Sequence, residues 1–403
     1  MDVLTTTQGQ KNLPRYFRAA FAMAGRLQAG RLDVRLPDGR VFRVQGDAPG
    51  PAAELNIHDP DVFSRLIREG DLGFSEGYLD GAWDTPDLQA FMDLIHAGSD
   101  TVSDSYPAMG LIRLFERMRF WLQSNTKRQA RKNISHHYDL GNDFYSHWLD
   151  DTMTYSSALF QSGQESLEVA QESKYAQMVD QLGAQPGDHV LEIGCGWGGF
   201  AEYAAAKRGL KVTGLTISQA QYDYAVGRME RLGLADRVAI KLQDYRDERG
   251  VYDGIASIEM FEAVGERYWP VYFHALRELL KPGKNATLQI ITVEDSRWEL
   301  YRKSVDFIQK YIFPGGMLPS PTVLRQEVER AGLSVARSVE FGDSYDLTLR
   351  RWHETFNAKW DEICLLGFDE RFRKMWNYYL TSCAASFQNG ICDVTQITVT
   401  KPA

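Results

Sequence analysis

From about residue 135 onward, apolar runs typical of buried strands alternate with amphipathic stretches of helical spacing. Strands are predicted at 189–194, 210–217, 238–243, 252–260 and 285–293, and helices at 198–209, 218–233 and 269–283. Ser218 is a predicted helix cap and Gly209 a predicted helix end. Residues 391–401 alternate as a closing strand. This order predicts a doubly wound, parallel α/β sheet whose ligands bind at the carboxyl ends of the strands.

The first hundred residues follow a different pattern. Apolar residues recur at helical spacing over 12–30, with Asn12 as the predicted cap, and alternate on both sides of a Pro-Asp-Gly turn, which predicts a hairpin over 32–44. Residues 59–95 are typical of two helices joined by a Gly-rich turn. We therefore expect an α+β domain over residues 1–105, a basic helical linker over 106–134 and an α/β domain over 135–403.

Composition adds limits to this picture. The chain has 403 residues, of which 44% are hydrophobic and 25% charged, so two globular domains are expected. No apolar run could span a bilayer, and the start lacks the features of a signal peptide. Four cysteines without C-x-x-C spacing indicate reduced thiols. We expect a cytoplasmic protein, and the net charge of −9 opposes nucleic-acid binding.

Positive charge is nevertheless concentrated locally. Residues 111–132 contain seven basic residues and one acidic residue, with aromatic residues between them. A basic, aromatic helix of this kind can bind an anionic membrane surface. The same pattern is also typical of a solvated helix face packed on a second domain. On the first interpretation, the protein associates peripherally with the inner face of the membrane.

The stretch HVLEIGCGWGGF contains three glycines in the spacing G-x-G-x-x-G (Gly194, Gly196 and Gly199). This spacing occurs in loops that bind dinucleotides and in loops that bind other nucleosides. A dinucleotide fold places an acid at the end of the second strand to bind the ribose, but Leu215 and Thr216 stand there. The acids are instead Glu192, before the loop, and Asp244, after the third strand. This arrangement favours S-adenosylmethionine over NAD.

Further motifs resemble those of cyclopropane-fatty-acyl-phospholipid synthases in both sequence and order. They are HYDLGNDFYSHWLDDTMTYSSALF, VLEIGCGWGG, VTGLTIS, LQDYRD, MFEAVGERYW, YIFPGGMLPS and FGDSYDLTLRRW. The resemblance covers the chain from about residue 135 to the end, and extends weakly to residues 72–83. It implies a Rossmann-like, S-adenosylmethionine-dependent methyltransferase domain with a lid insertion, preceded by a smaller lipid-binding domain.

The reaction that the resemblance implies is methyl transfer to a double-bond carbon of an unsaturated acyl chain in membrane phospholipid. The transfer leaves a carbocation on the chain, so an apolar slot, stabilisation of the cation and a base are needed. Six aromatic residues are candidates for the slot (Tyr268, Trp269, Phe273, Tyr311, Phe313 and Trp352).

The resemblance also implies the positions that bind the methyl donor. Matched motifs place residues near its methionine part (Tyr155, Ser156, Gly194 and Gly196), its ribose (Thr216 and Gln221) and its adenine (Asp244 and Tyr245). Five more positions match the surroundings of the transferred methyl, where the family holds a bicarbonate ion that serves as the base (Ser157, Glu262, Gln289, Ile291 and Tyr345).

Two of these five positions depart from the family's pattern. Ser157 stands where the family has a cysteine, and Gln289 stands where it has a histidine. Both side chains can donate hydrogen bonds to an anion, but glutamine cannot carry a positive charge. Either a modified bicarbonate site persists, or the cation loses a proton from the chain. The second outcome gives a methylene or methyl-branched product, the latter with a separate oxidoreductase partner.

Other interpretations remain open at this point. An NAD-dependent oxidoreductase would use the same glycines, and a non-catalytic lipid-binding scaffold would account for the changes at Ser157 and Gln289. Glu262 is also compatible with a structural acid at a helix start. The pair His136-His137 has no third ligand at suitable spacing, so no metal is expected. A homodimer is compatible with the sequence.

Overall fold

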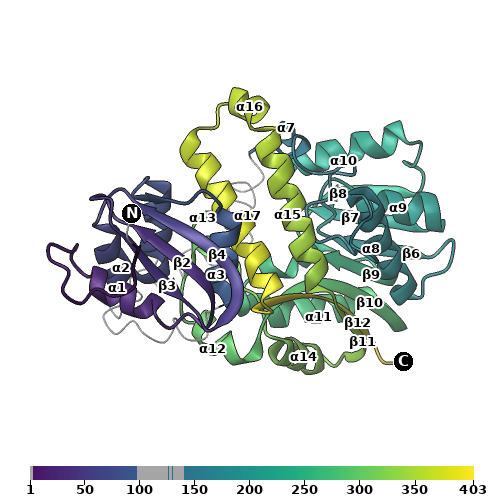
Figure 1. Ribbon diagram of the computed structural model, residues 1–403. Coiled ribbons are helices and arrows are strands. Elements are labelled where there is room, and N and C mark those ends of the chain that lie inside the picture. The colour runs from purple at the N-terminus through teal and green to yellow at the C-terminus, as the bar shows by residue number, and fades with distance from the viewer. Residues whose placement is uncertain (1–2, 98–125, 127–128, 130–139) are drawn as a thin grey trace. The chain divides into compact units, whose positions relative to one another are not determined.

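The computed structural model describes residues 3–97, 126, 129 and 140–403, which form two compact units (Figure 1). The first unit comprises Met1–Arg119, Ser304–Ile312 and Gly367–Asn389, and the second comprises Phe120–Lys303, Phe313–Leu366 and Gly390–Ala403. Two segments of the predicted 135–403 domain therefore group with the N-terminal unit. Most of the predicted basic linker, and His136-His137, lie outside the described residues.

The first unit is built on a five-stranded sheet with the order β1-β3-β2-β4-β5. Its strands are β1 (Val3–Leu4), β2 (Ala29–Arg35), β3 (Val41–Gln45), β4 (Ala48–Ile57) and β5 (Trp83–Asp84). The predicted hairpin is confirmed, because β2 and β3 are antiparallel and Val34 lies opposite Phe42. Both residues belong to the core of this unit, as expected from the alternation of apolar and polar residues along the two strands.

The described residues of the first unit also form the helices α1 (Phe17–Ala24), α2 (Val62–Leu79), α3 (Leu88–Ala97), α13 (Phe307–Tyr311) and α17 (Glu370–Gln388). Helix α1 begins five residues after the predicted cap, because Asn12 and Tyr16 both have positive φ (55° and 63°), outside the right-handed helical region. The late segments are part of the same fold. Ala385 of α17 lies in the core, and the ring centroids of Phe307 and Tyr378 are 4.5 Å apart.

The second unit contains a seven-stranded sheet with the order β11-β12-β10-β9-β6-β7-β8. The strands are β6 (His189–Ile193), β7 (Lys211–Thr216), β8 (Val238–Leu242), β9 (Tyr252–Ile258), β10 (Leu280–Val293), β11 (Ser334–Glu340) and β12 (Cys392–Thr400). Strands β6 to β10 are parallel, and β12 pairs antiparallel with both β10 and β11. The doubly wound α/β class is confirmed, with an antiparallel addition at one edge.

Helices cover both faces of this sheet (Figure 1). Val190 and Leu191 are neighbours on β6 and point to opposite faces, as expected for a strand. Val190 packs in the core formed with α8 (Leu167–Leu182), α9 (Gly199–Arg208) and α10 (Gln219–Arg231). Leu191 packs in the core formed with α11 (Trp269–Leu279) and α14 (Pro321–Arg330).

Local sequence signals set the ends of these helices. The Ser218 side chain accepts a hydrogen bond from the Gln221 amide, and Gly209 ends α9 with φ of 67°, as predicted. Helix α11 ends four residues before the predicted limit. Pro282 disfavours helical backbone at the residue before it, and Leu280 pairs with Tyr252 as the first residue of β10.

Within the described residues of the second unit, the remaining elements are short, apart from one long helix, α15 (Gly342–Ala358). They are α7 (Asn142–Ser146), α12 (Trp298–Tyr301), α16 (Trp360–Ile363) and the 3₁₀ turns η2 (Tyr245–Asp247), η3 (Phe261–Ala263), η4 (Glu266–Tyr268), η5 (Asp295–Arg297) and η6 (Cys364–Leu366). Among the described residues, no helix combines the length and apolar character needed to cross a membrane.

Candidate active site

The glycine loop joins β6 to α9 at the carboxyl edge of the sheet. Gly194 and Gly196 have positive φ (82° and 51°), which glycine adopts without steric cost. The backbone amides of Gly194 and Cys195 both donate to the Leu215 carbonyl, so the loop is fixed to the end of β7. A Cβ atom on Gly196 would meet no protein atom within 4 Å. The loop therefore leaves space for a ligand beside Gly196.

Glu192 lies just before this loop and is buried. Its Oε2 atom has no hydrogen-bond partner among the described residues. Burial raises the pKa of Glu192 to about 8, while the positive charges of Lys174 and Arg228 oppose the rise. A buried carboxylate oxygen without a donor costs free energy unless a ligand supplies one. The ammonium and hydroxyl groups of S-adenosylmethionine are such donors, so Glu192 fits this ligand.

Thr216 and Gln221, both matched to the ribose, meet where β7 leads into α10. The Thr216 hydroxyl donates to Gln221 Oε1 over 2.9 Å, and both side chains are buried. Asp244 follows β8, and Arg246 neutralises it through an ion pair of 2.6 Å. Tyr245 is the next residue, and its hydroxyl is buried without a partner among the described residues. The predicted ribose and adenine positions thus lie at successive strand ends, β7 and β8.

Tyr155 and Ser156 lie in the segment between α7 and α8. Lys174 of α8 is fully buried and donates from Nζ to Ser156 Oγ over 2.7 Å. Burial lowers the pKa of Lys174 to about 7, against the opposing effect of nearby carboxylates. The Tyr155 ring lies 5.4 Å from Trp352 and 5.5 Å from Trp148, measured between centroids. The segment with Tyr155 and Ser156 therefore contacts the buried amino group of Lys174 on α8 and packs against buried tryptophan rings.

Glu259 is the centre of the hydrogen-bond network that joins the predicted catalytic positions. It follows β9 directly, and its carboxyl group is enclosed by protein although the residue as a whole is partly exposed. Oε1 accepts hydrogen bonds from the backbone amide of Ser157 and from Gln289 Nε2, both over 2.8 Å. Oε2 accepts a hydrogen bond from the Tyr345 hydroxyl over 2.6 Å. Burial raises the pKa of Glu259, and Lys174 and these donors oppose the rise.

Glu262 lies in η3, one turn after Glu259. Its Oε1 accepts a hydrogen bond from the backbone amide of Ile291 over 2.6 Å, and its Oε2 has no partner among the described residues. Burial, with a further contribution from the charge of Glu259, raises the pKa of Glu262 to about 8. Of the five predicted catalytic positions, Glu262 is therefore one of two neighbouring carboxylates, and the other four donate hydrogen bonds to this pair.

The expectation about the Ser157 side chain needs correction. The Ser157 hydroxyl donates to the Ala158 carbonyl, so Ser157 contributes its backbone amide to the network and not its side chain. The six aromatic candidates for the acyl slot also do not act as one set. Trp269 and Phe273 are core residues of the second unit, and Tyr311 belongs to the first unit, where it donates to Glu76.

The residues at the matched bicarbonate positions do not fit a bound bicarbonate ion. The amide of Ser157, the Gln289 side chain and the Tyr345 hydroxyl all donate to Glu259, and the amide of Ile291 donates to Glu262. The Gln289 amide group also donates to the Ser157 carbonyl, so both of its N–H bonds are accounted for. The donors that would hold an external anion are occupied by carboxylates of the chain itself.

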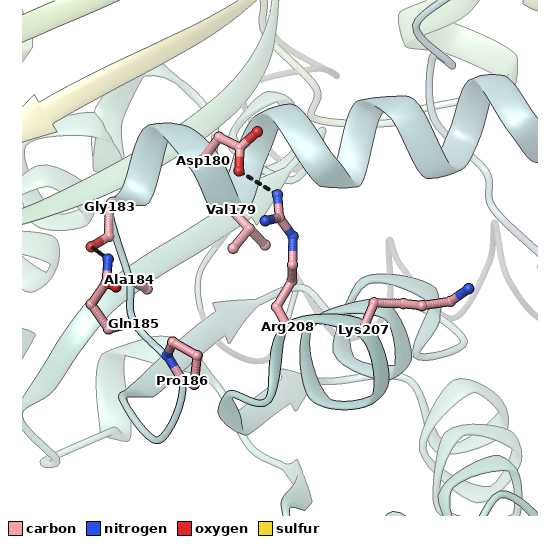
Figure 2. Close-up of a pocket in the computed structure, with 8 residues that line it drawn as sticks. All are labelled: Val179, Asp180, Gly183, Ala184, Gln185, Pro186, Lys207 and Arg208. Atoms are coloured by element: carbon pink, nitrogen blue, oxygen red, sulfur yellow. Dashed lines mark hydrogen bonds and ion pairs between the residues drawn. The ribbon is translucent and has the colours of Figure 1, made fainter.

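A pocket of about 380 Å³ lies elsewhere on the second unit (Figure 2). It is lined by Val179, Asp180, Gly183, Ala184, Gln185, Pro186, Lys207 and Arg208. These residues come from the ends of α8 and α9 and from the loop that precedes β6, and Asp180 forms an ion pair with Arg208. None of the predicted site residues lines this pocket.

Comparison with known proteins agrees with this geometry. The family model described as mycolic acid cyclopropane synthetase matches residues 125–397. The chain belongs to this family. A tuberculostearic acid methyltransferase of Mycobacterium tuberculosis is 38% identical over 406 residues, covering 94% of this chain and 91% of that protein. A cyclopropane-fatty-acyl-phospholipid synthase of Escherichia coli is 37% identical, covering 88% and 92%.

Among solved structures, a mycolic acid cyclopropane synthase complexed with SAH and CTAB superposes with a TM-score of 0.63 at 30% identity. It covers 67% of this chain and 98% of that chain. This member of the cyclopropane synthetase family is accordingly an S-adenosylmethionine-dependent methyltransferase, of a family that acts on lipids. The comparisons therefore favour S-adenosylmethionine over the NAD-dependent alternative.

Sequence reasoning missed Glu259. A signal was present, because SIEM places an acidic residue at the carboxyl end of a predicted parallel strand, where ligands of such sheets bind. The backbone of Glu259 has φ of 47°, in the left-handed region that a non-glycine residue adopts at a steric cost. Strained, buried polar residues cluster at functional sites, so Glu259 belongs to the candidate active site.

Proposed function

We propose that this enzyme transfers a methyl group from S-adenosylmethionine to a double-bond carbon of an unsaturated acyl chain in membrane phospholipid, through a carbocation on the chain. The observation that carries the proposal is the pair of neighbouring buried carboxylates, Glu259 and Glu262, at the carboxyl edge of the sheet. Negative charge held in a low-dielectric site stabilises a cation that develops beside it. The names of the two relatives, a fatty-acid methyltransferase and a phospholipid cyclopropane synthase, support a lipid substrate.

The methyl donor would be held by residues at the ends of β6 and β7. Glu192 would accept hydrogen bonds from its donors, the space beside Gly196 would receive it, and Thr216 and Gln221 would contact its ribose. When bound, S-adenosylmethionine supplies an electrophilic methyl group on a positively charged sulfur. An alkene is a weak nucleophile, so the protein must hold the two reactants close together and exclude water.

Aromatic rings give the cation a second source of stabilisation. Trp148 and Trp352 are almost fully buried, and their ring centroids lie 5.6 Å apart. Tyr155 packs against both, and Phe313 stacks on Tyr155 at 6.5 Å. The faces of aromatic rings carry negative electrostatic potential that attracts cations. Of the aromatic candidates predicted for the slot, Phe313 and Trp352 support the acyl chain in this proposal.

The product is either a cyclopropane ring or a methylene group, and a methyl branch requires a further step. In that step, a separate hydride-donating oxidoreductase reduces the methylene group. The substrate lies in a membrane, so we expect the protein to act at the cytoplasmic surface of the bilayer. The basic, aromatic stretch 111–132 supports this location.

Labelled methyl donor and vesicles test the proposal directly. The purified chain is incubated with S-adenosylmethionine labelled in its methyl group and with vesicles of mono-unsaturated phospholipid. Fully saturated phospholipid serves as the control. Mass spectrometry of the released fatty acids should show a gain of one labelled methylene unit in the unsaturated chains only, and chromatography against ring and branched standards identifies the product. Label in neither lipid would contradict the proposal.

A further inference from the structure

The reaction needs a base. The family resemblance implies bicarbonate as that base, but the residues of this chain do not fit a bound bicarbonate ion. Once the methyl has been added, a C–H bond of that methyl group must release its proton. The proton acceptor must be basic, must lie beside the cation and must be shielded from water. The resemblance implies bicarbonate for this role, but the four donors matched to its site are engaged by Glu259 and Glu262.

Glu259 has the chemical features of the missing anion. A carboxylate and a bicarbonate ion share a planar O–C–O group with a single negative charge, and both accept hydrogen bonds at two oxygens. The Glu259 carboxylate receives the hydrogen bonds of Ser157, Gln289 and Tyr345, three of the five matched positions. These donors come from three different segments of the chain, so the carboxylate is fixed in place before any ligand binds.

We propose that the Glu259 carboxylate is the base that deprotonates the lipid carbocation, in place of a bound bicarbonate ion. This inference rests on the proposed function. For the ring, a C–H bond of the new methyl group breaks, and its electron pair forms the bond to the cationic carbon that closes the ring. For the methylene product, a hydride first moves from the methylated carbon to the cationic carbon, and the electron pair of a methyl C–H bond then forms the double bond. The proton goes to a carboxylate oxygen of Glu259, which returns it to solvent after the product leaves. No oxidant or reductant is needed.

Features of the surroundings support Glu259 over Glu262 in this role. Lys174, fully buried nearby, counteracts the rise in the pKa of Glu259 and so favours its ionised, basic form. The pKa of Glu262 is raised to about 8, and the charge of Glu259 contributes to that rise. Of the two carboxylates, Glu259 is therefore the one whose ionised form is favoured. Mutual repulsion divides such a pair into one base and one acid.

The backbone at position 259 gives a sharp test, because its positive φ suits glycine. Glu259→Gly removes the carboxylate and leaves its three donors around an empty space the size of a small planar anion. Glu259→Gln keeps the shape of the side chain but removes its charge. Glu329→Gln, at an exposed position on α14, is the matched control. All are assayed for labelled lipid product in buffer freed of carbon dioxide, with and without added bicarbonate or formate.

The wild type and Glu329→Gln should be fully active without bicarbonate. Glu259→Gln should lose about a hundredfold or more of the rate and gain nothing from bicarbonate, because the amide fills the site. Glu259→Gly should lose as much, and bicarbonate or formate should restore part of the rate. Binding of S-adenosylhomocysteine, measured by tryptophan fluorescence, should change less than about threefold in both variants, which excludes unfolding.

The outcomes separate this inference from the proposed function. If the wild type labels no unsaturated lipid with or without bicarbonate, the proposed function itself is wrong. If the wild type is active only with added bicarbonate, or if Glu259→Gln keeps the wild-type rate, the proposed function stands and Glu259 is not the base. If Glu259→Gly is inactive with every added anion although it binds S-adenosylhomocysteine normally, replacement of bicarbonate by Glu259 is also rejected.

Discussion

The hydrogen bond from Tyr345 to Glu259 allows the role of the carboxylate to be probed by removing a single oxygen atom. Tyr345→Phe keeps the ring, which is 6% exposed and lies edge-on to Trp352 at 6.2 Å. It removes a donor that lies 2.6 Å from Glu259 Oε2. Hydrogen bonds to a charged group contribute about 1.5–3 kcal/mol, and this one is short and buried. Because the bond favours the ionised carboxylate, its loss raises the pKa of Glu259.

The sign of the effect follows from that shift. A base is active when it is ionised, so the acidic limb of the rate–pH profile should move to higher pH in the variant. At a pH on that limb the rate falls about 10- to 100-fold, and at high pH it approaches the wild-type rate. The assay is the initial rate of labelled methyl incorporation into unsaturated vesicles, measured across the pH range.

A matched variant shows whether the effect is specific. Tyr311→Phe removes a hydroxyl that donates to Glu76 over 2.7 Å. Both residues belong to the first unit, and neither forms a hydrogen bond with Glu259 or its donors. Its rate–pH profile should equal that of the wild type. If Tyr345→Phe lowers the rate equally at every pH, the tyrosine has only a structural role. If its acidic limb does not move, the reasoning about Glu259 is refuted.

Three further predictions concern the donor site and the second carboxylate. Glu262→Gln should abolish methylene addition while changing S-adenosylhomocysteine binding less than about threefold; lost binding would indicate a structural role instead. Because Glu192 has a pKa of about 8, S-adenosylhomocysteine should bind more tightly as pH rises from 6 to 8, and Glu192→Gln should remove this dependence in calorimetric titrations. Gly196→Ala should weaken that binding more than about tenfold, because its Cβ points into space left for the ligand. Its urea midpoint should fall only slightly, since the strain at φ of 51° costs about 1–2 kcal/mol; unchanged binding would show that the ligand lies elsewhere.

The α/β fold was predictable because its signals are local. Strand β6 and the glycine loop follow from apolar runs and from backbone positions that only glycine fills without strain. Ser218 and Gly209 mark helix ends through their own hydrogen bonds and dihedral angles. Short-range patterns of this kind can be read from the sequence because they do not depend on contacts with distant parts of the chain.

The parts that were missed depend on long-range contacts. Helix α17 has an ordinary amphipathic sequence, and nothing in it shows that Ala385 packs in the core of the N-terminal unit. Ser157 acts through a backbone amide, which any residue would supply, so its side chain carried no information about the network. Glu259 became recognisable only when Ser157, Gln289 and Tyr345, from distant segments, were seen to meet at its carboxylate.

The most direct test of the central claim is the fatty-acid mass spectrum of mono-unsaturated phospholipid vesicles treated with the wild-type protein and labelled S-adenosylmethionine, in buffer freed of carbon dioxide. The account predicts that the unsaturated chains gain one labelled methylene unit without added bicarbonate, because Glu259 supplies the base. Unsaturated chains that stay at their original mass both with and without bicarbonate would contradict the proposed methyl transfer. Chains that gain mass only when bicarbonate is added would contradict the role of Glu259 as the base.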